Sequence, residues 1–600
     1  MEKIKISSTF VTIFKIIWMR VLFPVFCTGF VDCILFSVFI AGWWMPVSDL
    51  HAQVEVAPGR YRIEFADKNH NAYTISLPQY FLSERALQRR AKQGIVVTQA
   101  DLPVSACYID SLKQLGFEIL NTSRWFNSAT IRCTPEDLEK LNHLSFIKQS
   151  LVIQKENIQD TTVDRKSDPE TPFSFFFLKK NEEEVNTKYG APVQYYGLAA
   201  NQVGMMNGHA LHDRGFRGKG MMIAVIDGGF HKVMELSGFD SLRNSGRLQA
   251  IKNFTPDIDN ITGENNHGTN VFSIIASNLS GRMMGSAPDA DYLLIRSEEI
   301  EHEYIVEEDN WIAAVEYADS IGVDLITSSL GYTTFDDLSQ NHSYSDLNGR
   351  TVRTSRAATM AAARGMIVCL SAGNDGDTNW KYISVPADAD SVITIGAVDR
   401  EGRYASFSSK GYTADKRIKP DLVAMGRETA YQSSMGVINT GNGTSYSTPL
   451  LAGLIACLWQ AFPEKNNMEI MDMVKRSANH YHEPDSLYGY GIPDFSKLIP
   501  ATSFLSSIKN ELYTVSVHND PGTGKLTLYL SPEKHGHVYI LIKTVSGQKI
   551  LAHDGYVSNY NGYQLSISDS AKFTDGMYWG EVRSDAGVVF FLFEFMHHDK

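Results

Sequence analysis

The chain has 600 residues and a mass of 67.0 kDa, which is too long for one compact core and, at about 150 residues per domain, indicates three or four domains. Its 43% hydrophobic and 20% charged residues exclude collagen-like, coiled-coil and largely disordered proteins. The formal net charge of −13 makes nucleic acid and anionic lipid unfavourable partners, and six cysteines in a chain of this length do not form a disulfide scaffold.

Residues 1–52 have the pattern of a secretory signal peptide. Basic residues between Lys3 and Arg20 precede an apolar region that Asp32 interrupts, and the charge-free runs on either side of Asp32 are each shorter than the ~20 residues of a membrane-spanning helix. Ala52 offers a small residue at a cleavage point. We therefore predict a secreted or cell-surface protein, with an uncleaved N-terminal anchor as the alternative.

Residues 53–153 alternate strand-like and helix-like stretches and indicate a small α+β unit. The expected elements are strands at 61–65, 117–120 and 129–131, a helix at 83–93, and a further helix that starts at Thr134 with Pro135 in its first position. Residues 154–195 are polar and charged, which is typical of a solvated linker. The aromatic run Phe173–Phe177 inside this linker is expected to dock on a neighbouring surface.

Residues 196–500 alternate apolar runs with helical segments, which indicates a parallel sheet covered by helices on both faces. Strands are expected at 222–226, 292–295, 323–326, 366–370 and 392–395. Residues 501–600 contain short strand-like runs separated by Gly, Asn and Asp, which predict a small all-β C-terminal domain. Cys369 and Cys457 fall in apolar segments and are expected to be buried thiols.

Three segments of the α/β region carry reactive groups. Asp227 directly follows an apolar strand, His267 opens an apolar helix, and Ser445 follows two glycines at the start of a helix predicted over Leu450–Phe462. Parallel sheets place such groups at the carboxyl ends of their strands. A serine hydroxyl is protonated at neutral pH and needs a base and an orienting acid, so this set predicts a nucleophile, a general base and an acid.

Asn374 adds a fourth group to this set. It lies in the segment Ser371–Gly376, which follows another predicted strand, and its side-chain amide can donate a hydrogen bond to an oxyanion. Pro449 is expected in the first turn of the helix after Ser445, whose free N–H groups would favour a developing negative charge.

These motifs resemble those of the subtilisin-like serine proteases over about 300 residues. The match rests on ordered segments: Ile226–Gly229, His267–Thr269, Ser371–Gly376 and Gly443–Ser445, with secondary motifs at 285–288, 329–331, 385–387, 407–411, 419–421 and 489–491. The resemblance implies a three-layer α/β fold and a serine endopeptidase that uses Asp227, His267, Ser445 and Asn374. It also implies that substrate pairs with two extended segments, Ser329, Leu330 and Gly331 on one side and Ala372 and Gly373 on the other.

The flanking regions carry further resemblances. Segments 81–86 and 123–127 are similar to propeptides of bacterial secreted members of this family, which implies a zymogen whose partners are protein or peptide substrates and its own propeptide. The C-terminal domain resembles the sorting domains of the type IX secretion system through Gly547, Gly576–Tyr578 and Gly587. The alternative for this domain is an ordinary β-sandwich that contacts a ligand or the cell surface.

Several features remain open at the level of sequence. Tyr446 and Ser447 replace the Met-Ala pair that often follows the serine in this family. No cofactor and no metal ligand are predicted, and the sequence has no Asp-x-Asp-x-Asp-Gly loop from which a calcium requirement could be inferred. The charged runs 298–299 and 307–309 are expected to be solvated. A catalytically silent, protease-like surface binding protein is the alternative to an active enzyme.

Overall fold

The computed structural model describes three continuous stretches, residues 54–148, 189–255 and 265–499, and the strands of the last hundred residues. In that last region the described residues are 506–509, 513–520, 525–532, 536–544, 548–557, 563–567, 573, 576–584 and 587–595. The predicted signal peptide, the predicted linker up to residue 188 and the aromatic run Phe173–Phe177 lie outside these residues. Among the described helices, none combines the length and the apolar character needed to cross a membrane.

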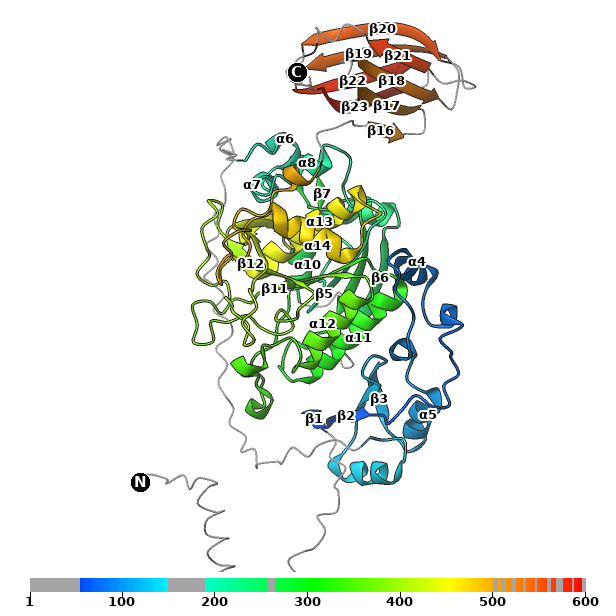
Figure 1. Cartoon of the computed structure of the whole chain (residues 1–600), viewed down its shortest axis with the longest axis vertical. Coiled ribbons are helices and arrows are strands. Elements are labelled where there is room, and N and C mark those ends of the chain that lie inside the picture. The colour runs from blue at the N-terminus through cyan, green and yellow to red at the C-terminus, as the bar shows by residue number, and fades with distance from the viewer. Residues whose placement is uncertain are drawn as a thin grey trace, which may run out of the picture.

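The central domain is built on a parallel sheet, as the sequence predicts (Figure 1). Seven strands follow the order β13-β12-β11-β10-β5-β9-β6. Their bounds are β5 Met222–Asp227, β6 Leu248–Asn253, β9 Asp291–Arg296, β10 Leu325–Ser328, β11 Ile367–Ser371, β12 Ile393–Val398 and β13 Leu422–Met425. The two edge strands, β6 and β13, were not predicted; β6 is half polar, and β13 is a run of four residues. Strand β10 begins two residues later than expected.

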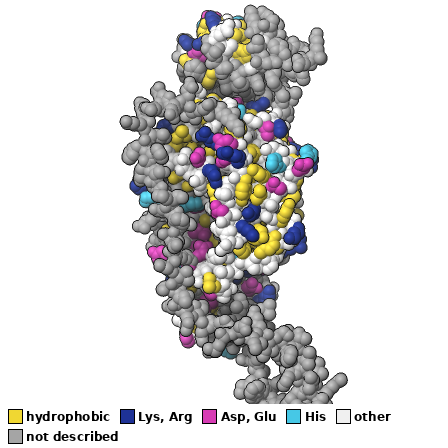
Figure 2. Space-filling view, turned by 90° about the vertical axis from the view of Figure 1, so that its left-hand side faces the viewer, with side chains coloured by type: hydrophobic (Ala, Val, Ile, Leu, Met, Phe, Trp, Pro, Cys, Tyr) yellow, Lys and Arg dark blue, Asp and Glu magenta, His cyan; other side chains and the backbone are white. Residues whose placement is uncertain are grey.

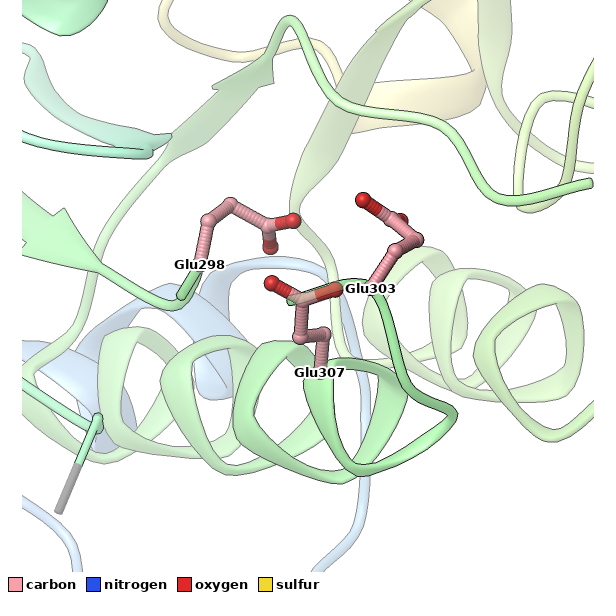
Figure 3. A group of neighbouring side chains, drawn as sticks. All are labelled: Glu298, Glu303 and Glu307. Carbon is pink, nitrogen blue, oxygen red and sulfur yellow. The ribbon is translucent and has the colours of Figure 1, made fainter. Parts of the chain in front are cut away.

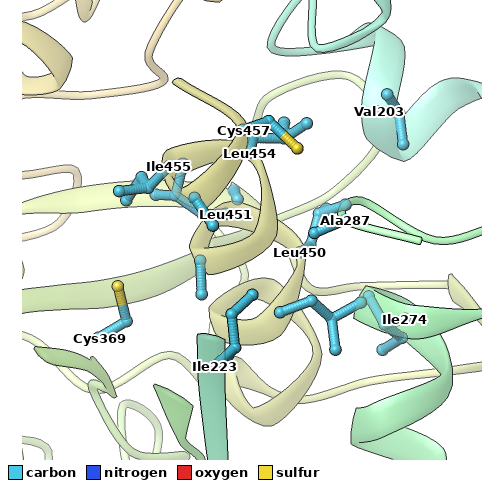
Figure 4. Packing of buried hydrophobic residues seen from close by; sticks show 14 of the residues in the cluster. Val203, Ile223, Ile274, Ala287, Cys369, Leu450, Leu451, Leu454, Ile455 and Cys457 are labelled. Atoms are coloured by element: carbon cyan, nitrogen blue, oxygen red, sulfur yellow. The ribbon is translucent and has the colours of Figure 1, made fainter. Parts of the chain in front are cut away.

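Helices cover both faces of this sheet and form three layers with it (Figure 1). One face packs on α10 (His267–Ala276), α13 (Thr444–Ala461) and α14 (Asn467–Ser477), and the other on α11 (Val306–Ile321) and α12 (Arg353–Ala363). Alternate residues of β5 serve the two faces, since Ile223 belongs to the first core cluster and Ala224 to the second. Figure 4 shows the first cluster, in which Cys369 and Cys457 are fully buried as expected.

Short helices complete the central domain and shift one predicted boundary. They are α6 (Val193–Tyr196), α7 (Ala200–Gly204), α8 (His209–His212) and α9 (Asp240–Asn244). Ala191 is buried in the first core cluster and Tyr189 packs against it, so residues within the stretch predicted as linker contribute to the core of the central domain. The side chains of Tyr189 and Ala191 explain the difference, because they contribute to the core although polar residues precede them.

On the surface, acidic and basic side chains are mixed. Figure 2 shows Lys and Arg beside Asp and Glu, with hydrophobic side chains between them, over the described part of the visible face. This face therefore presents no broad positive field of the kind that attracts a phosphate backbone.

The N-terminal unit, residues 54–148, is an antiparallel sheet with helices. Its strands β1 (Val54–Ala57), β2 (Arg60–Glu64), β3 (Glu118–Ser123) and β4 (Ser128–Arg132) follow the order β1-β2-β4-β3. Helices α4 (Glu84–Lys92) and α5 (Ala106–Gln114) accompany them. Thr134 caps the segment Pro135–His143 as expected, but this segment is a 3₁₀ helix.

The N-terminal unit packs against α11 through buried ion pairs, beside the helices drawn in green in Figure 1. The carboxylate of Asp319 on α11 is fully buried and binds three arginines of the unit, Arg89, Arg90 and Arg124. Glu316, one turn earlier on α11, accepts hydrogen bonds from the main-chain N–H groups of residues 124 and 125. A buried carboxylate that meets three guanidinium groups is a strong determinant of this interface.

The structure contradicts the prediction that residues 307–309 form a solvated face. Glu307, Glu308 and Asp309 are 0%, 1% and 6% exposed. Asp309 is paired with Arg62 of the N-terminal unit at 2.8 Å, and Glu308 with His342 at 2.5 Å. A run of acidic residues resembles a surface helix turn in the sequence, whereas here their partners come from distant segments.

The C-terminal residues form two antiparallel four-stranded sheets, in the orders β16-β17-β18-β21 and β20-β19-β22-β23. The bounds are β16 Ser506–Lys509, β17 Tyr513–Asp520, β18 Lys525–Pro532, β19 Gly536–Thr544, β20 Lys549–Val557, β21 Tyr563–Ile567, β22 Gly576–Ser584 and β23 Gly587–Phe595. Val538, Ile540 and Val582 are buried, which gives the module an apolar interior. The all-β prediction for this region is confirmed.

Candidate active site

Three neighbouring strands end where the predicted site residues begin. In the sheet, β11, β10 and β5 are adjacent, and they end at Ser371, Ser328 and Asp227. Ser328 is in register with Ile226, so Ser329 follows β10 beside Asp227. Because adjacent strands lie about 4.8 Å apart, the sheet gathers these chain segments at one edge.

Asp227 and His267 form a direct hydrogen bond. Asp227 is fully buried, and its Oδ1 lies 2.7 Å from Nδ1 of His267. The bond requires α10 to approach the end of β5 closely, and Gly268 permits this, since a Cβ at that position would lie 2.4 Å from the main-chain oxygen of Gly229. With Nδ1 bonded to the carboxylate, Nε2 is the nitrogen that can accept a proton.

The environment of His267 sets its basicity. Burial lowers the pKa of His267, but the charge of Asp227 and the hydrogen bond to it act in the opposite direction and raise the pKa above its usual value of 6.5. The imidazole is therefore a stronger base than an isolated histidine, and Asp227 stabilises the imidazolium that forms when it takes up a proton.

Ser445 lies at the N-terminus of α13, which begins at Thr444 rather than at Leu450. Pro449 therefore falls inside the helix, not in its first turn as predicted. Proline has no N–H to donate to the carbonyl four residues earlier, which is that of Ser445. The hydroxyl of Ser329 donates to this carbonyl at 3.1 Å instead, and the helix runs without a break from Thr444, directly after Gly443, past Pro449.

Further contacts hold the start of α13 between the other site segments. Oδ1 of Asn374 accepts hydrogen bonds from the main-chain N–H and the hydroxyl of Thr444, at 2.9 and 3.0 Å. On the other side, burial raises the pKa of Tyr446, and the side chain of Asn270, one turn after His267 on α10, lies close enough to the Tyr446 hydroxyl to oppose that rise. Ser445, between Thr444 and Tyr446, is thus bracketed by the segments that carry Asn374 and His267.

The geometry around Gly443 is suited to an oxyanion. A Cβ built on Gly443 would lie 3.6 Å from the main-chain nitrogen of Ser445 and 3.7 Å from Nδ2 of Asn374. Two N–H donors therefore border the same small space, which the absence of a side chain at Gly443 leaves open. Since Oδ1 of Asn374 is bonded to Thr444, its Nδ2 is the end that faces this space.

The predicted substrate-binding residues occupy different positions. Ser329 is buried and Gly331 is exposed, so the segment 329–331 runs from the core to the surface beside Ser445. Gly373 is half-buried. Ala372, by contrast, is fully buried, and its N–H and C=O are bonded to Ile395 and Ser384 within the domain. The structure thus places Ala372 behind the surface that a substrate could reach.

Two supporting residues were missed as parts of the site in the sequence. Asn270 has no motif of its own, and its contact with Tyr446 depends on how α10 and α13 cross. Tyr431 stacks on the ring of Tyr446 at 5.2 Å between centroids, with 12° between the planes. This packing explains how a tyrosine is accommodated directly after Ser445. In the sequence, only the unusual residue Tyr446 indicated that its neighbours in the fold would differ.

Comparison with known proteins agrees with the architecture. Residues 218–491 match the model of the subtilase family, and residues 60–170 match the Bacteroidota peptidase S8 propeptide domain. The serine protease AprX of Bacillus subtilis is 28% identical over 315 residues, which is 47% of this chain and 67% of that protein. Subtilisin E of Bacillus subtilis is 27% identical over 344 residues, 56% of this chain and 79% of the relative. Among solved structures, MycP1 from Mycobacterium smegmatis has a TM-score of 0.40 and 19% identity, with 52% of this chain and 87% of that one covered.

The fold and the family matches define a serine endopeptidase that is made with its own propeptide and acts on peptide substrates. The central domain is a subtilase-family peptidase, and the N-terminal unit is its propeptide domain.

Proposed function

We propose that Asp227, His267 and Ser445 are the catalytic triad of this endopeptidase and that Asn374 stabilises the oxyanion. Ser445 Oγ attacks the scissile carbonyl while His267 Nε2 accepts its proton, and the imidazolium then protonates the leaving amine. Nδ2 of Asn374 and the N–H of Ser445 donate to the oxyanion. Water hydrolyses the acyl-enzyme by the reverse sequence of proton transfers, with Asp227 orienting His267 throughout.

The observation that carries this proposal is the Asp227–His267 hydrogen bond at the same sheet edge as the start of α13. The most direct test is labelling with a fluorophosphonate, which reacts only with an activated serine. We expect mass spectrometry to find the label on Ser445 in the wild type and in Ser447→Ala, a change at a buried neighbouring serine, but not in Ser445→Ala. An unlabelled wild type would favour a silent binding protein.

Substrate is expected to pair with the segment 329–331 and with Gly373. Ser384 lies between them, because a Cβ on Gly331 or on Gly373 would meet its hydroxyl at 2.0 or 3.3 Å. A small, uncharged residue at this point suits an uncharged substrate side chain better than a charged one.

Replacing Asn374 with alanine should lower kcat by about 10²- to 10³-fold with little change in KM, because its Nδ2 bond forms chiefly with the oxyanion. Steady-state kinetics on a fluorogenic peptide measure the two constants separately. Asn244→Ala, a change at an exposed asparagine at the end of α9, is the matched control. A loss confined to KM would assign Asn374 to ground-state binding.

The pH dependence follows from the raised pKa of His267. The value of kcat/KM should rise with pH through a midpoint above 6.5 and fall on acidification, because only neutral imidazole accepts the proton of Ser445. Asp227→Asn removes the negative charge that raises this pKa, so its residual activity should titrate at lower pH. A midpoint below 6.5 in the wild type would contradict this assignment of the base.

We infer that residues 1–52 direct export and that the segment 154–195 is cut during maturation. A tethered propeptide has a high effective concentration at the peptidase until the tether is cleaved, which keeps the zymogen inactive. The subtilase relatives and the propeptide domain support export. N-terminal sequencing of the secreted enzyme tests both inferences.

For the C-terminal β module we propose a role in sorting or surface contact after export. In the native host, a chain that ends at residue 500 should keep its peptidase activity but accumulate inside the cell. Normal secretion of the shortened chain would contradict a sorting role and favour the alternative, a ligand-binding β-sandwich.

A further inference from the structure

Three glutamates converge beside the candidate active site (Figure 3). Glu298 follows β9, Glu303 lies in the next loop and Glu307 lies in the first turn of α11. One carboxylate oxygen from each lies within 4.8 Å of the others. Oxygen ligands of one Ca²⁺ bind at about 2.3–2.6 Å, so opposite ligands are up to about 5 Å apart.

Glu307 has an unsatisfied oxygen inside this cluster. The residue is 0% exposed, and its Oε1 accepts the main-chain N–H of Glu299 at 2.7 Å. Its Oε2 is buried without a hydrogen-bond partner among the described residues. Burying such a group without a partner is costly, which indicates that something positive or a proton occupies the space between the carboxylates.

Burial and mutual repulsion disfavour the charged form of these glutamates. Burial, followed by the charge of Glu303, raises the pKa of Glu298 to about 8, and burial, followed by the charge of Glu298, raises the pKa of Glu307 well above its usual value. Among nearby basic groups, Arg60 is paired with Glu299, and Arg296 donates to the main-chain oxygen of Glu298.

We propose that Glu298, Glu303 and Glu307 bind a divalent cation, Ca²⁺. An all-carboxylate set suits hard cations rather than zinc, which prefers nitrogen and sulfur. The three side chains come from a strand end, a loop and a helix, and such an adaptable set suits the variable geometry of Ca²⁺ better than the strict octahedron of Mg²⁺. Water completes the coordination.

The ion has a structural consequence for the peptidase. Glu298 adjoins the catalytic strand end, because a Cβ on Gly228 would lie 3.7 Å from its Cβ. Its Oε1 also accepts the hydroxyl of Tyr332 at 2.7 Å, and Tyr332 directly follows the segment 329–331. Ca²⁺ at this point fastens the loop 298–307 to the segment that is expected to bind substrate.

The test uses the full-length chain with Ser445→Ala, which prevents self-cleavage, after treatment with a chelator. Tb³⁺, which substitutes for Ca²⁺, should show luminescence on excitation of tyrosine, because Tyr332 is bonded to a ligand. We expect Ca²⁺ to displace Tb³⁺ and to raise Tm. Glu307→Gln should lose both responses, whereas Glu301→Gln, at an exposed glutamate in the same loop, should keep them.

Misfolding of the variant can be distinguished from loss of the site. Without metal, Glu307→Gln should unfold at the same or a higher temperature than its parent, since it removes a buried acidic group. The proposal is overturned if the chelated parent binds neither ion or if Glu307→Gln binds both with unchanged affinity. A third outcome would also overturn it: no ion binds, and Glu307→Gln in the active enzyme lowers kcat/KM only for substrates with Lys or Arg. The cluster would then be a substrate subsite.

Discussion

Replacing Ser445 with alanine should abolish peptide hydrolysis while the fold remains intact. The change removes one hydroxyl at the start of α13, and the main-chain bonds that hold this turn, those of Thr444 to Asn374 and of the Ser445 carbonyl to Ser329, do not involve it. Loss of the nucleophile in a serine protease of this type lowers kcat about 10⁶-fold. Hydrolysis of a fluorogenic peptide measures the loss, and thermal unfolding checks the fold.

The same variant reports on maturation. If the cut between propeptide and peptidase is autocatalytic, Ser445→Ala should accumulate as the uncleaved chain, whereas the wild type yields a fragment that begins before Tyr196. Ser447→Ala serves as the control and should mature normally. Activity of Ser445→Ala within tenfold of the wild type would show that Ser445 is not the nucleophile.

Replacing Asp319 with asparagine should weaken the binding of the propeptide by about 10²- to 10³-fold. Asp319 is the common partner of Arg89, Arg90 and Arg124, and both it and the first two arginines are almost fully buried. Asparagine keeps the shape but removes the charge, which leaves three guanidinium groups with no carboxylate at their centre. Breaking a buried pair by removing one partner costs about 3–5 kcal/mol.

The measurement requires a chain whose halves can separate. A recognition sequence for a specific protease, placed between residues 154 and 188 of the Ser445→Ala chain, allows the linker to be cut, after which dissociation on dilution gives Kd. Asp472→Asn is the matched control, because Asp472 forms an exposed pair with Arg476 on α14 and should leave Kd unchanged. An equal Kd for both variants would show that the buried network does not hold the propeptide.

The local patterns of this sequence were sufficient to predict much of the fold. Runs such as Met222–Ile226 are buried on both faces and apolar throughout, so their strands could be recognised without a structure. Edge strand β6 was missed because half of its residues are polar and it therefore forms no apolar run. The predicted start of the helix that carries Ser445 was several residues too late. Pro449 leaves a carbonyl without its helical N–H donor, and the donor that replaces it, Ser329, lies 120 positions before Pro449 in the sequence.

What the sequence by itself determined is the set of reactive groups and their places at element ends. Asp227 after a strand, His267 at a helix start and Ser445 after glycines follow from local spacing and from the backbone that each motif needs. Only the tertiary structure decided which distant groups meet. It placed His267 2.7 Å from Asp227 and buried Asp319 among three propeptide arginines. It also gathered Glu303 with Glu298 and Glu307, which were expected to be solvated. The physical reason is that burial and charge pairing depend on long-range packing, which no local pattern records.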